Sequence, residues 1–180
     1  MVSGAWVSRR CWARALQAQV LIAVDLSIVK LDLAREFGAT RTFNAADPDC
    51  AERIREATRG GVDYAFEMAG SVKAMDLAYR ITRRGGTTVT AGLSHPQAQF
   101  SIPHLGIVAE ERTIKGSYLG SCVPARDIPR YIEWFQEGRL PVDKLVSSHL
   151  RLEDINAGFD TLADGASIRQ IVSFDATPGT

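Results

Sequence analysis

Short runs of strand-forming residues alternate with helical patterns over the first half of the chain, and this alternation restricts the fold more than any other feature. The apolar run 20–25, which ends in an acid, is typical of a strand buried on both faces. Strands that alternate with helices form βαβ units, which build a parallel sheet with helices on both sides. We therefore predict an α/β fold with a doubly wound, Rossmann-like parallel sheet. The four expected strands are 20–25, 42–44, 62–67 and 87–91.

Local start and stop signals place helices between these strands. Ser27 is a suitable N-cap for a helix over 28–37. Asp47-Pro48 predicts a second helix with the proline in its first turn. Arg83-Arg84 suits the C-terminus of a third helix that starts at Ser71, because cations are favourable there. Beyond residue 91 we expect a proline-bearing connection, a strand at 112–119, a helix at 125–136, an extended segment at 147–152, a short helix at 153–162 and a strand at 169–174.

The charge balance and the apolar pattern argue against several classes of protein. Lys and Arg total 21 and Asp and Glu total 21, so the formal net charge is zero. That balance argues against nucleic acid or an anionic membrane as a partner. No apolar run approaches the roughly 20 residues of a membrane span, and the N-terminus lacks a secretory signal pattern. The three widely spaced cysteines, Cys11, Cys50 and Cys122, form no disulfide framework, which predicts a cytoplasmic protein.

Asp25 is the most informative single residue. An acid at the carboxyl end of a strand, followed by a helix, is where doubly wound domains bind the ribose of an adenine dinucleotide. Its carboxylate accepts hydrogen bonds from the ribose hydroxyls and repels the 2′-phosphate of NADP. Lys30 is close enough in sequence to reach the same ribose edge. The alternative is that Asp25 only caps the start of the following helix.

The glycine-rich turn that should precede such an acid is missing. A Gly-x-Gly-x-x-Gly turn brings backbone amides close to the pyrophosphate about 20 residues before the ribose acid. Residues 1–20 contain a single glycine, Gly4, and no strand alternation. We therefore expect the sheet to lack its first strand and its glycine loop. The predicted organisation is an anomalous segment at 1–19, a dinucleotide-binding domain at 20–174 and a tail at 175–180.

Four further features of the sequence bear on function. His95 follows the fourth strand, where it is either catalytic or a solvated loop residue. Glu67 ends the third strand, and acid–base chemistry is one interpretation of it. Gly116-Ser-Tyr-Leu-Gly120 is not a Gly-x-Ser-x-Gly nucleophile elbow, because its serine is the second residue and not the third. Arg169 is either an anion contact or a surface charge.

Several stretches together resemble the cofactor-binding half of a medium-chain, zinc-containing alcohol dehydrogenase. Their order and spacing match that family over about residues 20–174. The stretches are Ile22-Ala-Val-Asp-Leu-Ser27, Leu33-Ala-Arg-Glu-Phe-Gly-Ala-Thr40, Gly61-Val-Asp-Tyr-Ala-Phe-Glu-Met-Ala-Gly70, Arg84-Gly-Gly-Thr-Thr-Val-Thr-Ala-Gly-Leu93, Lys115-Gly-Ser-Tyr-Leu-Gly120 and Ser167-Ile-Arg-Gln-Ile-Val172.

The resemblance implies a role for each matching position. Asp25 and Lys30 match the family's ribose contacts. Ala91-Gly92-Leu93 matches the strand end beside the nicotinamide, and Tyr118 and Leu119 match the segment that closes over it. Arg169 matches an arginine on the pyrophosphate. Family members pair an edge strand, here near Arg112 to Tyr118, across a homodimer.

The family's catalytic parts have no counterpart in this sequence. The zinc ligands and the proton relay of the family lie largely in an N-terminal domain, so the resemblance implies NAD here and zinc only in the full-length enzyme. We expect an oxidoreductase fragment, from an enzyme that transfers hydride between an alcohol or aldehyde and NAD, that is inactive by itself. The alternatives are a non-catalytic nucleotide-binding or dimerisation module and an inert truncated product.

A shifted reading frame accounts for the missing glycines. In the frame that starts at the last base of each codon, Met1-Val2, Trp6-Val7 and Trp12-Ala13 all encode glycine, whichever codon serves the second residue. The hypothesis is that residues 1–19 are a frame-shifted version of the glycine loop and its helix. Codons that spoil this pattern in the genomic sequence would contradict it.

Overall fold

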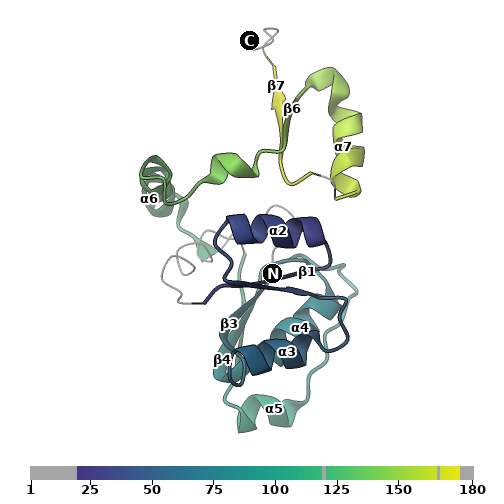
Figure 1. Cartoon of the computed structure of the whole chain (residues 1–180), viewed down its shortest axis with the longest axis vertical. Coiled ribbons are helices and arrows are strands. Elements are labelled where there is room, and N and C mark those ends of the chain that lie inside the picture. The colour runs from purple at the N-terminus through teal and green to yellow at the C-terminus, as the bar shows by residue number, and fades with distance from the viewer. Residues whose placement is uncertain (1–19, 119–120, 166, 175–180) are drawn as a thin grey trace. The chain divides into compact units, whose positions relative to one another are not determined.

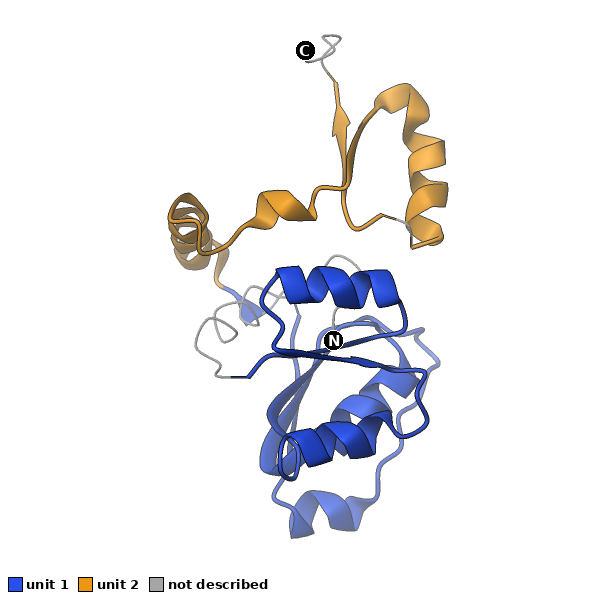
Figure 2. Cartoon of the chain, in the orientation of Figure 1, with its two compact units in different colours: residues 1–122 blue, residues 123–180 orange. Residues whose placement is uncertain are grey.

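A computed structural model describes residues 20–118, 121–165 and 167–174 of the chain (Figure 1). The chain divides into two compact units, residues 1–122 and 123–180, and each is described by itself (Figure 2). The proposed N-terminal segment 1–19 and the tail 175–180 lie outside the described residues. The single domain over 20–174 stays a prediction.

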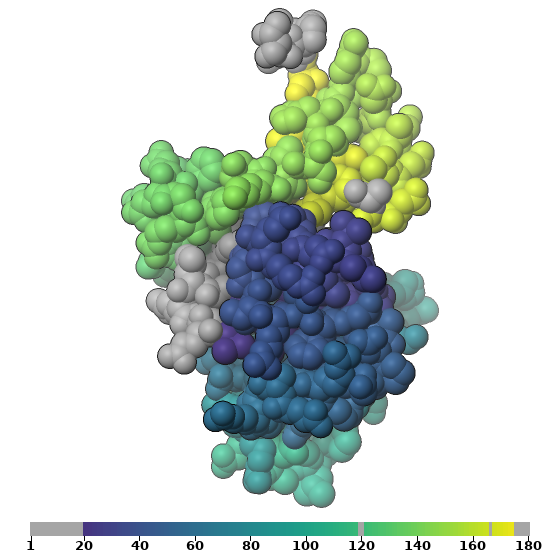
Figure 3. Space-filling model, in the orientation of Figure 1, coloured from purple at the N-terminus to yellow at the C-terminus, as the bar shows by residue number. Residues whose placement is uncertain are grey.

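Unit 1 begins with a strand–helix–strand unit. β1 (Ile22–Asp25) pairs in parallel with β2 (Arg41–Asn44), and α2 (Ile28–Glu36) connects them. Ser27 is the N-cap of α2, as predicted, and its Oγ accepts a hydrogen bond from the backbone N–H of Lys30 at 3.5 Å. The space-filling view shows α2 on the outer surface of unit 1 (Figure 3), in agreement with the exposure of Ile28 and Val29.

A second, three-stranded parallel sheet has the order β3-β4-β5. The carboxyl ends of its strands lie at one edge, because Glu67 pairs with Thr90 and Thr90 pairs with Gly116. Helices precede or connect these strands. The elements are α3 (Cys50–Ala57), β3 (Val62–Glu67), α4 (Val72–Ile81), β4 (Thr82–Thr90), α5 (His104–Ala109) and β5 (Thr113–Gly116).

Two buried clusters show that helices cover both faces of β1. Ala23 belongs to a cluster with Leu31 and Ala34 of α2. The next residue, Val24, belongs to a different cluster that includes Ile54 of α3 and other side chains of α3, β3 and α4. Successive strand residues point to opposite faces, so the helices lie on both sides of this strand. The predicted doubly wound α/β fold is thereby confirmed.

The sheet is in two pieces among the described residues. β2-β1 forms one sheet and β3-β4-β5 the other, and no described strand pairs with both β1 and β3. In the doubly wound order 3-2-1-4-5-6 the first strand occupies that position and joins the two halves. Residues 1–19 lie outside the described residues, so the absence of that strand stays a prediction.

Three of the differences from the sequence predictions have a clear physical reason. Arg83 and Arg84 lie in β4 and not at a helix end, because the Arg83 Nε pairs with Asp63 of β3 at 2.7 Å and Thr82 pairs with Val62. Pro48 precedes the N-cap of α3 rather than lying in its first turn. The connection after residue 91 contains the short helix α5, whose few residues give too little periodicity to detect.

Unit 2 contains a second parallel pair, β6 with β7. Gly158, on the helix Ile155–Ala163, packs closely against this pair, because an added Cβ would lie 2.8 Å from the side chains of Leu150 and Gln170. Trp134 is buried, with the guanidinium groups of Arg130 and Arg139 over its ring at 4.8 and 5.4 Å. The elements are α6 (Pro124–Gln136), η2 (Val142–Leu145), β6 (Ser148–Arg151), η3 (Leu152–Asp154), α7 (Ile155–Ala163) and β7 (Gln170–Ser173).

None of the helices within the described ranges is long and apolar enough to cross a membrane.

Candidate functional site

Asp25 ends β1, and its two carboxylate oxygens differ in their hydrogen bonding. Its residue surface is 8% exposed. Oδ1 accepts a hydrogen bond from the backbone N–H of Ser27 at 2.9 Å, so the carboxylate does support the start of α2. Oδ2 is buried and has no hydrogen-bond partner in the described part of the chain. A buried acceptor without a donor costs about 1–3 kcal/mol, so a ligand hydroxyl at this oxygen is favourable.

Lys30 lies in the first turn of α2, which begins three residues after Asp25. Ser27 donates its backbone N–H to Asp25 Oδ1 and accepts the backbone N–H of Lys30 at its Oγ. These bonds place the backbone of Lys30, and the ribose contact of its side chain stays a prediction. The carboxylate, with its unpartnered oxygen, fits the diol of a nucleotide ribose.

Glu67 holds the ends of β3 and β4 together. It is buried at 1% exposure. Its Oε1 accepts hydrogen bonds from the N–H groups of Ala69 and Gly70, both at 2.7 Å, and its Oε2 accepts one from the Thr90 hydroxyl at 2.9 Å. These bonds show a loop-positioning contact that the acid–base interpretation did not include. The only signal for it in the sequence is an acid at a strand end followed by Met-Ala-Gly-Ser.

The predicted strand-end segment Ala91-Gly92-Leu93 packs against the loop after β3. Ala91 and Gly92 donate their N–H groups to the Glu67 carbonyl oxygen at 2.9 and 3.3 Å. A Cβ on Gly92 would lie 2.1 Å from the Gly70 nitrogen. Gly70 itself has φ +66°, and a Cβ there would lie 2.3 Å from the Leu93 oxygen. The two glycines therefore permit a backbone-to-backbone contact at the carboxyl-terminal edge of the sheet, and beyond it Leu93 is exposed.

Tyr118 follows β5 at the same edge. The preceding Ser117 donates its N–H to the Thr90 carbonyl at 2.8 Å, which places this segment beside the end of β4. The Tyr118 side chain is exposed, and its carbonyl accepts the Ser121 N–H at 2.8 Å. Leu119, predicted to act with Tyr118, lies outside the described residues.

Arg169 belongs to unit 2 and comes directly before β7. Its backbone carbonyl accepts the Ser147 N–H at 2.7 Å, and its own N–H donates to the Ser147 hydroxyl at 3.4 Å. Since the two units are described separately, its predicted pyrophosphate contact stays a prediction.

The histidines form no group that resembles a metal site. His95 is exposed, and its Nδ1 accepts the Gln97 N–H at 3.3 Å, so it acts as a loop residue within its own turn. In the ranges that the structure describes, no cluster of three or more His, Cys, Asp or Glu side chains is placed to hold a metal ion.

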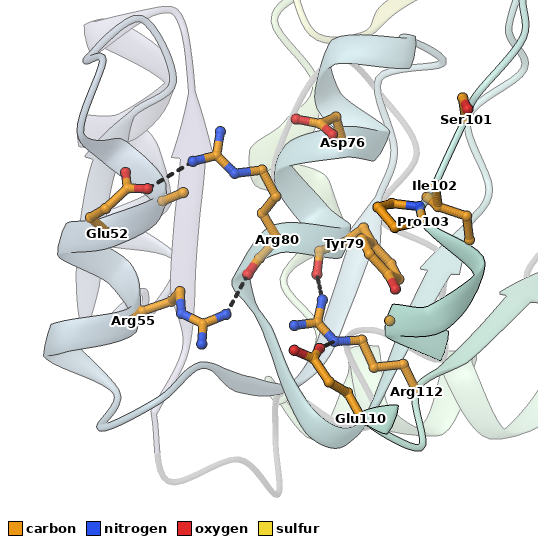
Figure 4. Close-up of a pocket in the computed structure, with 12 residues that line it drawn as sticks. Glu52, Arg55, Asp76, Tyr79, Arg80, Ser101, Ile102, Pro103, Glu110 and Arg112 are labelled. Carbon is orange, nitrogen blue, oxygen red and sulfur yellow. Dashed lines mark hydrogen bonds and ion pairs between the residues drawn. The ribbon is translucent and has the colours of Figure 1, made fainter. Parts of the chain in front are cut away.

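A cavity of about 540 Å³ lies among α3, α4 and α5, and none of the predicted site residues lines it. Figure 4 shows that Arg80 pairs with Glu52 at 2.7 Å and that Arg112 contacts Glu110 and the Tyr79 carbonyl. The Arg112 guanidinium lies 4.6 Å from the centre of the Tyr79 ring. The cavity is therefore separate from the strand-end site. One of its ion pairs joins α3 to α4, and the other involves Glu110, the C-cap residue of α5.

Comparison with known proteins agrees with this geometry. Residues 11–137 match the family described as zinc-binding dehydrogenase. Alcohol dehydrogenase 1 of Hordeum vulgare is 34% identical over 166 residues, which is 91% of this chain and 44% of that protein. The S-(hydroxymethyl)glutathione dehydrogenase of Paracoccus denitrificans is 32% identical over 171 residues, with 89% and 45% covered.

Solved structures give the same result. An alcohol dehydrogenase zinc-binding domain protein from Burkholderia ambifaria superposes with a TM-score of 0.85 at 31% identity, over 91% of this chain and 44% of that one. Benzyl alcohol dehydrogenase from Acinetobacter calcoaceticus superposes with a TM-score of 0.84 at 27% identity. The match covers 88% of this chain and 43% of that one. The chain thus spans less than half the length of the relatives it matches. From its sequence match and its doubly wound fold, the chain belongs to the zinc-binding dehydrogenase family.

Proposed function

We propose that this chain binds NAD as the coenzyme-binding part of a zinc-type alcohol dehydrogenase. The observation that carries the proposal is the buried Asp25 Oδ2, which has no hydrogen-bond partner among the described residues at the carboxyl end of β1. A ribose hydroxyl supplies the missing donor, and a 2′-phosphate in its place meets a like charge. NAD is therefore preferred over NADP.

The other predicted residues have supporting roles in this proposal. Lys30 reaches the ribose edge next to Asp25. The nicotinamide lies against the backbone of Ala91-Gly92-Leu93, where the absence of a side chain on Gly92 matters most. The resemblance assigns Tyr118 and Leu119 to the segment that closes over the ring, and Arg169 to the pyrophosphate.

Catalysis needs more than these residues supply. In the complete enzyme, zinc polarises the alcohol while NAD accepts the hydride. The described residues hold no group of metal-binding side chains, so we propose that the chain alone does not oxidise alcohols. Its role by itself is then nucleotide binding.

The exposed edge of β5 supports self-association as a second role. All four residues Thr113–Gly116 are exposed, and among the described strands β5 pairs only with β4. An open edge strand is a template for pairing with another chain. We propose a homodimer through the segment from Arg112 to Tyr118, which sedimentation analysis of the wild type and of Ile114→Pro tests.

Titration of the purified chain with NADH, followed by nicotinamide fluorescence, tests nucleotide binding. Asp25→Asn should weaken NADH about tenfold or more, because a hydrogen bond to a charged group contributes about 1.5–3 kcal/mol. The control Asp32→Asn makes the same chemical change on the exposed side of α2, where Asp32 pairs with Arg35, and should leave the Kd unchanged. Unchanged binding in Asp25→Asn, or no binding by the wild type, refutes the proposal. Zinc-dependent reduction of NAD with an alcohol refutes the proposed lack of turnover.

A further inference from the structure

Glu67 is a buried carboxylate that reaches both loops at the ligand edge of the β3-β4-β5 sheet. The N–H groups of Ala69 and Gly70 donate to Oε1, with Ser71 more distant at 3.5 Å. Oε2 accepts the Thr90 hydroxyl. Three backbone N–H groups therefore converge on one oxygen of this carboxylate.

No described Lys, Arg or His side chain forms an ion pair with this carboxylate. Its hydrogen-bond partners are neutral amides and one hydroxyl. The side chain is shielded from water at 1% exposure. The field of a buried charge is screened much less than that of an exposed one, so it acts on groups several ångströms away.

The charge lies directly behind the segment that we assign to the nicotinamide. The Glu67 carbonyl accepts the N–H groups of Ala91 and Gly92, and Gly92 contacts the loop that the Glu67 carboxylate holds. The nicotinamide ring carries a positive charge in NAD⁺ and none in NADH. A fixed negative charge behind the ring therefore distinguishes the two forms of one coenzyme.

We propose that Glu67 makes the site favour the oxidised coenzyme over the reduced one. This inference rests on the proposed binding of NAD. It differs from a purely structural role, because a loop contact affects both forms alike whereas a charge affects their ratio. Glu67 is thus a positioning residue for the two loops and also an electrostatic determinant of redox preference.

The test is the ratio Kd(NAD⁺)/Kd(NADH), with NADH measured by fluorescence and NAD⁺ by its displacement of NADH. Glu67→Gln keeps the size of the side chain and removes its charge, so the ratio should rise about 3- to 15-fold. That range corresponds to two unit charges roughly 10–15 Å apart at an effective dielectric constant of about 20–40. Asp63→Asn removes a carboxylate from the exposed, opposite end of the same strand and should leave the ratio unchanged. Thr90→Val, which deletes a hydrogen bond to Glu67 without changing charge, should lower stability but not move the ratio.

A second variant does not require Glu67 to be replaced. Ala69 is exposed, and Ala69→Asp adds a carboxylate to the same loop while leaving the hydrogen bonds of Glu67 in place. It should lower the ratio by about threefold, with Ala69→Asn as its neutral control. An unchanged ratio in folded Glu67→Gln, or in Ala69→Asp, overturns the inference while NADH binding by the wild type still supports the proposed function. A wild type that binds neither coenzyme refutes both.

Discussion

The backbone contact between Gly70 and Gly92 makes Gly92→Ala the most sharply defined perturbation of the strand-end site. An alanine Cβ at residue 92 would lie 2.1 Å from the Gly70 nitrogen, 2.7 Å from its Cα and 3.0 Å from the Ala69 carbonyl carbon. All three atoms belong to the backbone, so no rotamer change relieves the overlap. The loop after β3 must separate from the end of β4 by more than 1 Å to reach ordinary contact distances of about 3.5–4 Å.

The cost of this separation follows from what holds the loop in place. Overpacking of a well-packed site costs about 1–3 kcal/mol. The Glu67 carboxylate bonds the same loop at 2.7 Å to two N–H groups, so moving the loop also weakens those bonds. We expect the free energy of unfolding to fall by about 3 kcal/mol, which lowers the Tm of a domain this size by roughly 6–12 °C.

Gly116→Ala is the matched control. Gly116 ends the neighbouring strand, and a Cβ there meets nothing within 4 Å. That variant should be neutral or stabilise the protein by up to about 1 kcal/mol, because alanine reduces the entropy of the unfolded chain. Urea unfolding and thermal unfolding, both followed by circular dichroism, give the free energy of unfolding and the Tm of both variants. If Gly92→Ala unfolds within about 1 °C of the wild type, or Gly116→Ala loses as much stability, the steric reasoning is refuted.

Two further predictions concern the interior of unit 1. The Tyr79 hydroxyl is buried without a hydrogen-bond partner in the described residues, so Tyr79→Phe should leave the free energy of unfolding unchanged or raise it by up to about 1 kcal/mol. A loss above about 1 kcal/mol in urea unfolding would mean that the hydroxyl has a partner. Burial, helped by Asp47, raises the pKa of the Cys50 thiol, so less of it is thiolate at pH 8 and alkylation by iodoacetamide should be slower than at the half-buried Cys122. Mass spectrometry of peptides at pH 8 and 9.5 follows both rates, and equal rates in the folded protein contradict this prediction.

The fold was predictable wherever a local signal and the packing agree. The Ser27 cap, the third strand at Val62–Glu67 and the helix that ends at Gln136 all follow from residue type and periodicity. The start of β4 was not predictable. Two arginines after a helix suggest a helix end, but the Asp63 carboxylate on the neighbouring strand and the hydrogen bond between the Thr82 and Thr88 hydroxyls favour the extended form. Such contacts come from distant residues that no sequence window contains.

The candidate site, like the fold, was predictable from the sequence only in part. Position in the chain identified Asp25 as a strand-end acid, yet only packing decides that one oxygen bonds Ser27 and the other is buried without a partner. Glu67 was visible as an acid in a similar position. Its bonds to amides two and three residues ahead depend on the turn that Gly70 makes at φ +66°, which the sequence does not specify.

The two ends of the proposed nucleotide site are connected through apolar packing. Val24 of β1 and Ala65 of β3 belong to one buried cluster with Ile54 and Ala78, which lie on α3 and α4. No backbone pairing joins β1 to β3 among the described strands. A hydrogen-bonded ladder fixes the register of two strands, whereas apolar contacts have no direction and specify separation less strictly. The spacing between Asp25 and Gly92 therefore depends on how well Ile54 and its neighbours pack, and a strand paired with both sheets would fix it directly. For this reason the ribose contact, built within β1 and α2, depends less on the rest of the fold than alignment of the whole coenzyme does.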